Sequence, residues 1–253
     1  HIVKALRFEL GKVETTAIRM RMLGLLSQVD VDLADKVAAG LGLKVPAEPE
    51  LPMNHGVGAD ADPAKYEPKT VVQSVDSSTA LSMLKNPTNS PTIASRKVAF
   101  VCADGVSEAS VMNMKSALLK NDAKACIIAP HMGFIATQEG GEIPVEFTYL
   151  TASSVLFDAV YVPGGLGLQT LSGDCDVVEF LNDAYKHCKV IGADGEGIDL
   201  MAVTNFASNN ENVKDEGIVF GETAADPSFA QEFVAAMGQH RFWERENTIY
   251  KTI

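Results

Sequence analysis

The sequence has little positive charge, no long apolar run and no paired cysteine motif. Its 253 residues include 21 Lys and Arg against 33 Asp and Glu, which gives a formal net charge of −12. A chain this acidic is a poor ligand for nucleic acid, whose phosphates are bound by clustered Lys and Arg. No window approaches the roughly 18 consecutive apolar residues that a membrane-spanning helix needs. We therefore expect no nucleic-acid partner and no membrane segment.

The four cysteines are too widely separated to form a metal-binding motif. None belongs to a Cys-x-x-Cys pair, and no histidine lies near them at the spacing of a zinc site. Cys102 and Cys126 lie in apolar runs and are expected in the core, whereas Cys188 follows a helical pattern and is a candidate for oxidation. We expect no metal site. A reduced, cytoplasmic protein is the default expectation, with secretion left open.

Proline and charge divide the chain into three segments. Seven of the eleven prolines lie between Pro46 and Pro91, among Asn, Ser, Gly and Asp. This composition buries little apolar surface, so residues 46–95 are interpreted as a long linker with room for a short helix at 77–84. Residues 96–253 carry 22 acidic and 11 basic side chains, which is nearly all of the net charge. A linker of this length is expected to wrap over a neighbouring surface.

Residues 1–45 contain two amphipathic helical patterns. The first follows Thr15 or Thr16 and the second follows Asp30, and both residue types cap helices. Two short helices cannot enclose a core by themselves. They are expected to pack on the last segment or to belong to a domain whose remainder lies outside this sequence. Their apolar face, a candidate docking surface, contains Ile18, Met22, Leu26, Val37 and Leu41.

This first segment resembles the last helices of the haem core of large-subunit catalases. Four ordered runs carry the resemblance, at residues 1–13, 17–23, 29–34 and 37–43. The family dismutes hydrogen peroxide with haem, so the resemblance implies a haem in the parent protein and none in this sequence. It also implies that the partners are the rest of a catalase subunit and its homotetramer.

Residues 96–253 alternate short apolar runs with helical patterns. The apolar runs lie at 97–102, 125–129, 155–162 and 190–193, with a late strand at 219–220. Helices are predicted at 111–119, 176–187 and 228–237, and a hairpin turn at 139–144. Continuous apolar runs that alternate with helices are typical of a parallel sheet buried on both faces. The prediction is an α/β domain, with a parallel sheet sandwiched by helices.

Ligand sites in open α/β sheets form at the carboxyl ends of strands. Three such ends here are Asp104-Gly105, Pro163-Gly164-Gly165 and Asp194-Gly195-Glu196-Gly197. Together with Ala193, the last has the small-x-nucleophile-x-small form of a nucleophile elbow. Gly195 stands at the nucleophile position and has no side chain, so covalent chemistry is not expected there.

This segment resembles the PfpI-type, glutamine-amidotransferase-like superfamily. The matching residues are 97–101 with Asp104-Gly105, 157–165, and 190–193 with Gly197. The resemblance implies a flavodoxin-like fold. Active members carry a Cys, often followed by His, where this chain has Gly195 and Glu196, and a Glu where it has Ser110. The departures argue against protease, deglycase or glyoxalase activity. Large-subunit catalases end in such a domain, so the two resemblances agree.

The leading hypothesis is a C-terminal fragment of a haem catalase whose last domain is not an enzyme. That domain would stabilise the tetramer and hold unfolded client proteins as a chaperone. The alternatives are a hydrolase or glyoxalase with an unassigned nucleophile, and a purely structural brace. Asp194 and Glu196 are either an acid–base pair or two solvent-facing acids on one turn. A remnant ligand pocket would be lined by Asp104, Gly164, Gly165, Gly195 and Glu196.

Overall fold

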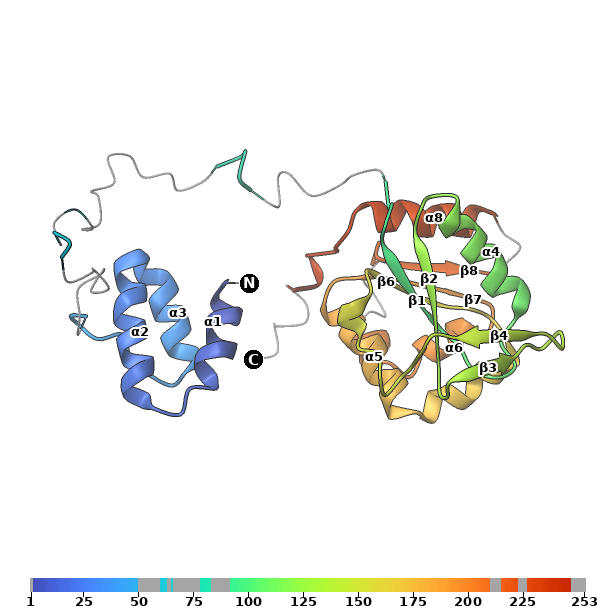
Figure 1. Ribbon diagram of the computed structural model, residues 1–253, viewed down its shortest axis with the longest axis horizontal. Helices are drawn as coiled ribbons and strands as arrows, with labels where there is room; N and C mark the ends of the chain where they lie inside the picture. Colours follow the sequence, from blue (N-terminus) through green and yellow to red (C-terminus); the bar gives the residue numbers. More distant parts are fainter. Residues whose placement is uncertain are drawn as a thin grey trace. The chain divides into compact units, whose positions relative to one another are not determined.

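The computed structural model describes residues 2–49, 60–62, 65, 78–82, 92–209, 215–222 and 227–246 (Figure 1). The chain separates into two compact units, His1–Asp76 and Ser77–Ile253. Most of the predicted linker lies outside the described residues, and so do both ends of the short helix predicted at 77–84. The described part of that helix, residues 78–82, forms a turn.

The first unit contains three helices, α1 (Ile2–Gly11), α2 (Thr16–Val29) and α3 (Val31–Gly40). The sequence pattern predicted only the last two. In α1, Val3, Leu6 and Leu10 pack inward. The exposed apolar residues Ile2 and Phe8 lie off this face and obscure the helical spacing of the buried ones, so the sequence pattern did not predict the helix. Asp30 caps α3 as expected, because its carboxylate accepts a hydrogen bond of 2.7 Å from the Leu33 N–H.

The third helix changes the interpretation of the predicted docking surface. Val37 is fully buried, and Met22, Leu26 and Leu41 are partly buried against the small core around it. The three helices therefore cover most of this stripe by packing on one another. Among the described residues of this unit, the large apolar side chains that remain exposed are Ile2, Phe8, Ile18, Val29 and Val31.

The second unit is built on a six-stranded sheet in the order β5-β2-β1-β6-β7-β8, in which every neighbouring pair is parallel. The strands are β1 (Lys97–Val101), β2 (Lys124–Ala129), β5 (Phe147–Thr148), β6 (Ala159–Val162), β7 (Val190–Asp194) and β8 (Ile218–Gly221). The predicted α/β class is confirmed. The run at 155–162 is a strand only from Ala159 onward, because its first residues belong to a short 3₁₀ helix, η2 (Ser154–Leu156).

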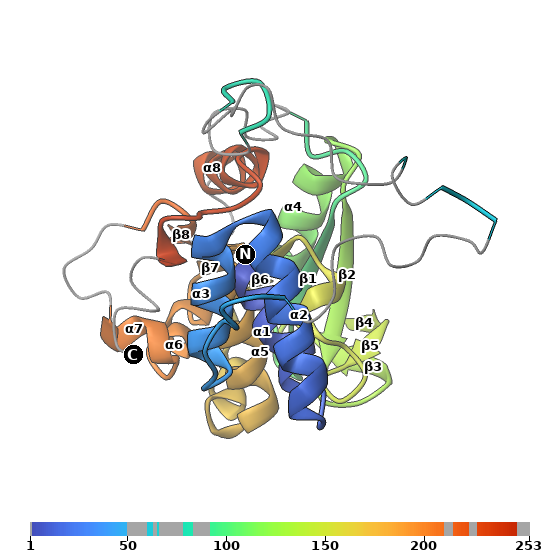
Figure 2. The ribbon, with the colours of Figure 1, turned by 90° about the vertical axis from the view of Figure 1, so that its left-hand side faces the viewer.

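Helices cover both faces of the sheet (Figures 1 and 2). One face carries α4 (Glu108–Leu119) and α8 (Pro227–Gly238). The other carries the 3₁₀ helix η3 (Leu166–Gly173), α5 (Cys175–Lys186), α6 (Gly197–Met201) and α7 (Asn205–Asn209). Val98 and Phe100 of β1 belong to the first core, and Ala99 and Val101 to the second. This alternation explains why the strand reads as a continuous apolar run.

A hairpin and a C-terminal segment complete the unit. The hairpin pairs β3 (Gly133–Ala136) with β4 (Glu142–Val145), so its turn comes slightly before the predicted position. After α8, the chain is fastened by Arg245, whose guanidinium pairs with both carboxylate oxygens of Asp215, at 2.7 and 2.9 Å. Arg245 also donates to the Lys189 carbonyl at 2.5 Å and lies over the Tyr185 ring.

Candidate functional site

The elbow follows β7 at the carboxyl edge of the sheet. Gly195 adopts a positive φ of 48°, and α6 begins two residues later at the buried Gly197. A Cβ atom at Gly195 would meet only the Gly164 Cα within 4 Å, at 3.5 Å, which is an ordinary contact. The turn therefore offers the geometry and the space of a nucleophile position, without a nucleophile.

The Asp194 carboxylate lies beneath this turn and is fully buried. One oxygen accepts a hydrogen bond of 3.0 Å from the Ser110 hydroxyl of α4, and the other accepts one of 2.6 Å from the Gly164 N–H. The Tyr161 hydroxyl donates to the Ser110 carbonyl at 3.3 Å. Burial raises the pKa of Asp194, while the hydrogen bonds from Ser110 and Gly164 act in the opposite direction.

The interpretation of Asp194 as a solvent-facing acid is therefore wrong. β7 continues one residue beyond the apolar run, so the Asp194 side chain follows the strand into the core. Ser110, where the sequence resemblance leads us to expect the superfamily's Glu, is the hydroxyl partner of this carboxylate. The nucleophile position itself, Gly195, is the next residue and takes no part in this hydrogen bond.

The Glu196 side chain is exposed, and its carboxylate accepts a hydrogen bond of 2.9 Å from the Gly165 N–H. Gly165 has a φ of 134°, and a Cβ there would lie 2.5 Å from the Gly105 carbonyl oxygen, so only glycine fits. Two consecutive N–H groups, of Gly164 and Gly165, thus each donate to a carboxylate of the elbow. The backbone donors that could cradle an anion are already occupied by this chain's own acids.

Asp104 lies apart from this arrangement. Its carboxylate accepts a hydrogen bond of 2.8 Å from the Ala136 N–H of β3 and lies 3.4 Å from the His131 ring. The Ala136 N–H, and then His131, lower the pKa of Asp104. The Met132 carbonyl, and then Asp104, raise the pKa of His131. Among the described residues, no hydrogen bond or ion pair joins Asp104 to Glu196.

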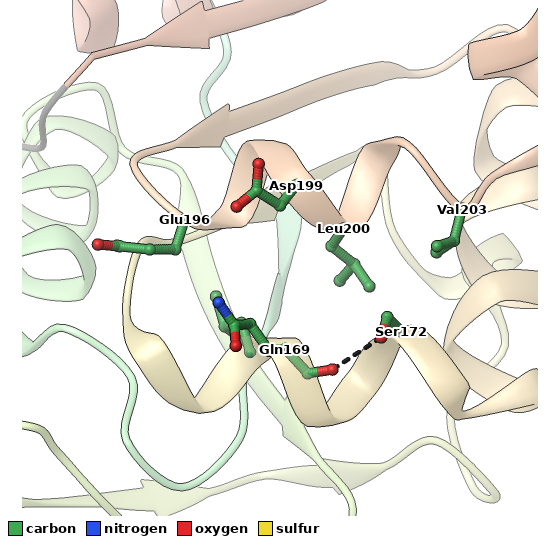
Figure 3. A pocket seen from close by; sticks show the side chains of 7 residues that line it. Gln169, Ser172, Glu196, Asp199, Leu200 and Val203 are labelled. Carbon is green, nitrogen blue, oxygen red and sulfur yellow. Dashed lines mark hydrogen bonds between the residues drawn. The ribbon is translucent and has the colours of Figure 1, made fainter.

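A cavity of about 480 Å³ opens beside the elbow, between η3 and α6 (Figure 3). The buried Leu168 and Leu200 contribute its apolar surface, and Leu200 points into the space. Its remaining lining residues are Gln169, Ser172, Glu196, Asp199 and Val203. Of the predicted pocket residues, Glu196 alone lines it. The sequence analysis did not predict the other residues that line this cavity. They lie in η3 and α6, which are too short to show a helical repeat of apolar residues, although both follow the small-residue turns that the sequence marks.

The cysteines and the acidic side chains give no metal centre in the described part of the chain, where no group of three or more His, Cys, Asp or Glu could hold a metal ion. Cys102, Cys126 and Cys188 are buried, whereas Cys175 is exposed. The expectation that Cys188 is open to oxidation does not fit its burial. No helix among the described residues combines the length and the apolar character needed to cross a bilayer.

Comparisons with known proteins agree on both units. Residues 94–247 match the family described as the C-terminal domain found in long catalases, and residues 1–41 match a catalase-related immune-responsive family. The second unit is also similar in fold to a ThiJ/PfpI domain protein from Brachyspira murdochii. That match has a TM-score of 0.50 and 18% identity, and covers 57% of this chain and 97% of that one.

Curated relatives extend the match over almost the whole chain. Catalase HPII of Mycobacterium avium is 37% identical over 254 residues, covering 97% of this chain and 33% of the relative. Catalase HPII of Pseudomonas aeruginosa is 37% identical over 250 residues, and Catalase-2 of Bacillus subtilis is 30% identical over 246. The chain spans about a third of the length of these relatives. The family match at residues 94–247 covers more than half of the sequence, so the chain belongs to the family of C-terminal domains found in long catalases.

Proposed function

We propose that this chain is the C-terminal part of a haem catalase, and that its α/β unit stabilises the parent tetramer without catalysing a reaction of its own. The elbow carries this proposal. A glycine occupies the nucleophile position, and the adjacent backbone donors are bonded to Asp194 and Glu196. Acyl-transfer chemistry needs both a nucleophile and free donors for the developing oxyanion. This elbow lacks the nucleophile, and two of its neighbouring donors, the Gly164 and Gly165 N–H groups, are already engaged.

The same contacts suit a structural role. Asp194 joins β7 to α4 through Ser110 and to the loop after β6 through Gly164. Glu196 adds a second connection from the elbow to that loop through Gly165. Three segments that would surround a substrate in an enzyme are thereby bonded to one another. These hydrogen bonds between the elbow, α4 and the loop after β6 favour a domain that acts through its surface.

Haem would supply the peroxide chemistry of the parent. The curated relatives that match almost the whole chain are catalases, and this chain spans about a third of their length, so we assign none of the described residues to the haem. Hydrogen peroxide dismutation is therefore proposed for the parent protein, with the haem bound by residues outside this chain. The part assigned to this chain is to keep the subunits of the parent assembled.

Deleting residues 96–253 from the full-length parent tests the proposal. We expect the activity per haem at low temperature to stay near that of the intact protein, while the melting temperature and the tetramer fraction in analytical ultracentrifugation decrease. The matched control is Lys120→Ala in the full-length parent, because this side chain is exposed on the same unit. Unchanged stability and assembly after the deletion would contradict the stabilising role.

A second candidate function is a holding chaperone. The exposed apolar side chains of the first unit, at Ile2, Phe8, Ile18, Val29 and Val31, offer a surface for unfolded clients. The net charge of −12 would keep such complexes dispersed. The chain at several-fold molar excess should slow the aggregation of a heat-labile client, and Phe8→Gln with Val31→Thr should weaken that effect. Equal aggregation with and without the chain would contradict it.

A further inference from the structure

The basic side chains of the α/β unit are gathered at one edge of its sheet. Every described Lys and Arg of this unit except Lys115 lies at the amino edge, where the strands begin. At the opposite, carboxyl edge, Lys and Arg are absent from the described segments 102–107, 130–141, 163–174 and 195–206. The five residues of β1 span about 16 Å, twice the Debye length of about 8 Å at physiological ionic strength. Solvent ions therefore largely screen the amino edge from the acids of the carboxyl edge.

Two arginines and a histidine meet at this amino edge. Arg96, which precedes β1, donates to the Met237 carbonyl near the end of α8. The Met237 carbonyl also accepts the His240 N–H at 3.0 Å. The Arg241 guanidinium donates to the His240 carbonyl at 2.8 Å and to the Asp158 carbonyl at 3.4 Å. These hydrogen bonds bring Arg96, His240 and Arg241 to the same end of α8.

The cluster carries more positive charge than its surroundings balance. Arg96 and Arg241 are partly buried, and among the described residues no ion pair engages either of them. Asp158 is the carboxylate that acts on Arg241 and His240, and one of its oxygens already accepts the Lys97 N–H at 2.9 Å. Burial lowers the pKa of Arg241, Asp158 opposes this effect, and Arg96 adds to it. Burial, Arg241 and Arg96 likewise lower the pKa of His240, against the effect of Asp158.

Both guanidinium groups keep donors for a ligand. A guanidinium carries five N–H donors. The hydrogen bonds of Arg96 and Arg241 to protein acceptors use only the Nη1 nitrogen of each. In the described part of the chain, no fully buried side-chain nitrogen lacks a partner, so the remaining guanidinium nitrogens lie within reach of solvent. They are therefore available to an acceptor from outside the chain.

We propose that Arg96, Arg241 and His240 form a binding site for a small dianionic oxyanion of the phosphate class. The planar fork of a guanidinium donates paired hydrogen bonds to the oxygens of such a group. The two negative charges of the ligand would offset the excess positive charge of the cluster. A nucleic acid carries the same group, but its length would bring it against the acids of the rest of the chain. The proposal is independent of the proposed function.

His240 provides a local readout of binding in the unaltered chain. Sulfate is the probe, because its charge is constant while an imidazole titrates. We expect sulfate to raise the pKa of His240 in histidine NMR, relative to chloride at the same ionic strength, because a nearby anion favours the charged imidazole. His131, beyond the carboxyl end of β2, is the internal control and should not respond, and His240→Gln assigns the signal. A His240 pKa that sulfate does not raise, or that rises no more than that of His131, would overturn the proposal.

Calorimetry at pH 8 then measures the contribution of the two arginines. Inorganic phosphate and glycerol phosphate, compared as probes, distinguish a free oxyanion from a phosphomonoester, and saturable binding of either supports the site. Arg241→Gln should weaken binding about tenfold. Arg241→Lys should weaken it less, because lysine keeps the charge but loses the fork.

A matched pair of variants separates the site from a general effect of charge. Arg96→Gln with Arg241→Gln should abolish saturable binding. Lys115→Gln with Lys120→Gln, which removes the same charge from exposed positions, should change the affinity less than about twofold. The melting temperature without phosphate checks the fold of each variant, and the His240 readout decides if Arg96→Gln does not fold. Equal weakening by both pairs, or no saturable binding of either probe to the unaltered chain, would contradict the site.

Discussion

Among its described residues, the α/β unit buries charged side chains in two regions, and the two regions are stabilised differently. At the elbow, Asp194 is surrounded by neutral donors, the Ser110 hydroxyl and the Gly164 N–H. At the C-terminal segment, Arg245 is paired with the opposite charge of Asp215, and the neighbouring Lys189 donates to the Ser154 carbonyl. The buried Asp194 carboxylate is thus stabilised by neutral hydrogen-bond donors without a counterion, whereas the buried Arg245 guanidinium is stabilised by an ion pair.

Breaking the Arg245–Asp215 ion pair should lower the free energy of unfolding more than removing the hydrogen bonds of Asp194. Arg245→Ala leaves the Asp215 carboxylate and the Lys189 carbonyl without their partner and removes the contact with Tyr185. We expect a loss of about 3–5 kcal/mol in the free energy of unfolding, measured by urea denaturation. The exposed Lys120→Ala is the control, and it should change the stability by less than about 0.5 kcal/mol. A small loss for Arg245→Ala would show that the segment is held by its apolar contacts alone.

Removing the elbow carboxylate should cost somewhat less. Asp194→Ala leaves the Ser110 hydroxyl and the Gly164 N–H without an acceptor, and each buried unsatisfied donor costs about 1–3 kcal/mol. We expect about 2–4 kcal/mol by the same measurement. Combining Asp194→Ala with Ser110→Ala removes one stranded donor and should recover part of the loss. Additive losses in this double-mutant cycle would indicate that the two side chains are not coupled.

Lys189 gives the cationic region a distinct pH dependence. Burial, together with Arg241, lowers the pKa of Lys189 from 10.5 to about 8, while Asp158 and Asp183 act in the opposite direction. Between these two values the unfolded chain binds more protons than the folded one, so stability should rise with pH. The expected rise from pH 7 to pH 10 is about 2 kcal/mol. Denaturation curves of Lys189→Met should lack this rise, and an equal rise in the variant would assign it to other groups.

The elbow hydroxyl should have the smaller effect on stability. Ser110→Ala removes one of the hydrogen bonds to Asp194 but leaves the bond from Gly164. We expect a loss of about 1–2 kcal/mol. Since the Ser110 bond opposes the effect of burial, its loss should raise the pKa of Asp194 further, which can be followed by carboxyl ¹³C NMR. Ser110→Thr, which keeps the hydroxyl, is the matched control. If the alanine substitution leaves the pKa of Asp194 unchanged, the hydrogen bond from Ser110 does not stabilise the charged form of this carboxylate.

The sequence predicted the scaffold of the elbow better than its contacts. Strands such as β1 and β7 were recognised because burial on both faces makes them continuous apolar runs, and the turn was recognised from its small residues. The burial of Asp194 was not, because its partner Ser110 lies 84 residues away and no local pattern links them. The cavity was missed for a related reason, since it is formed between η3 and α6, two short elements that lack a period.

The last prediction introduces a side chain at the elbow. It tests whether the backbone donors or the neighbouring carboxylates determine the pKa of a group at position 195. Gly195→Cys should fold, because its Cβ meets only an ordinary contact, with a loss of about 1–2 kcal/mol for a positive φ. The new thiol would be flanked in the chain by the acidic residues Asp194 and Glu196. Because nearby negative charge disfavours a thiolate, its pKa should be raised and alkylation at pH 7 should be slow. The measurement uses a Cys175→Ser background, in which the other three cysteines are buried. Adding Glu196→Gln should accelerate alkylation, because one of the two charges is then removed. Fast alkylation without that change would mean that the backbone of the elbow activates a thiol at position 195 in spite of the neighbouring carboxylates.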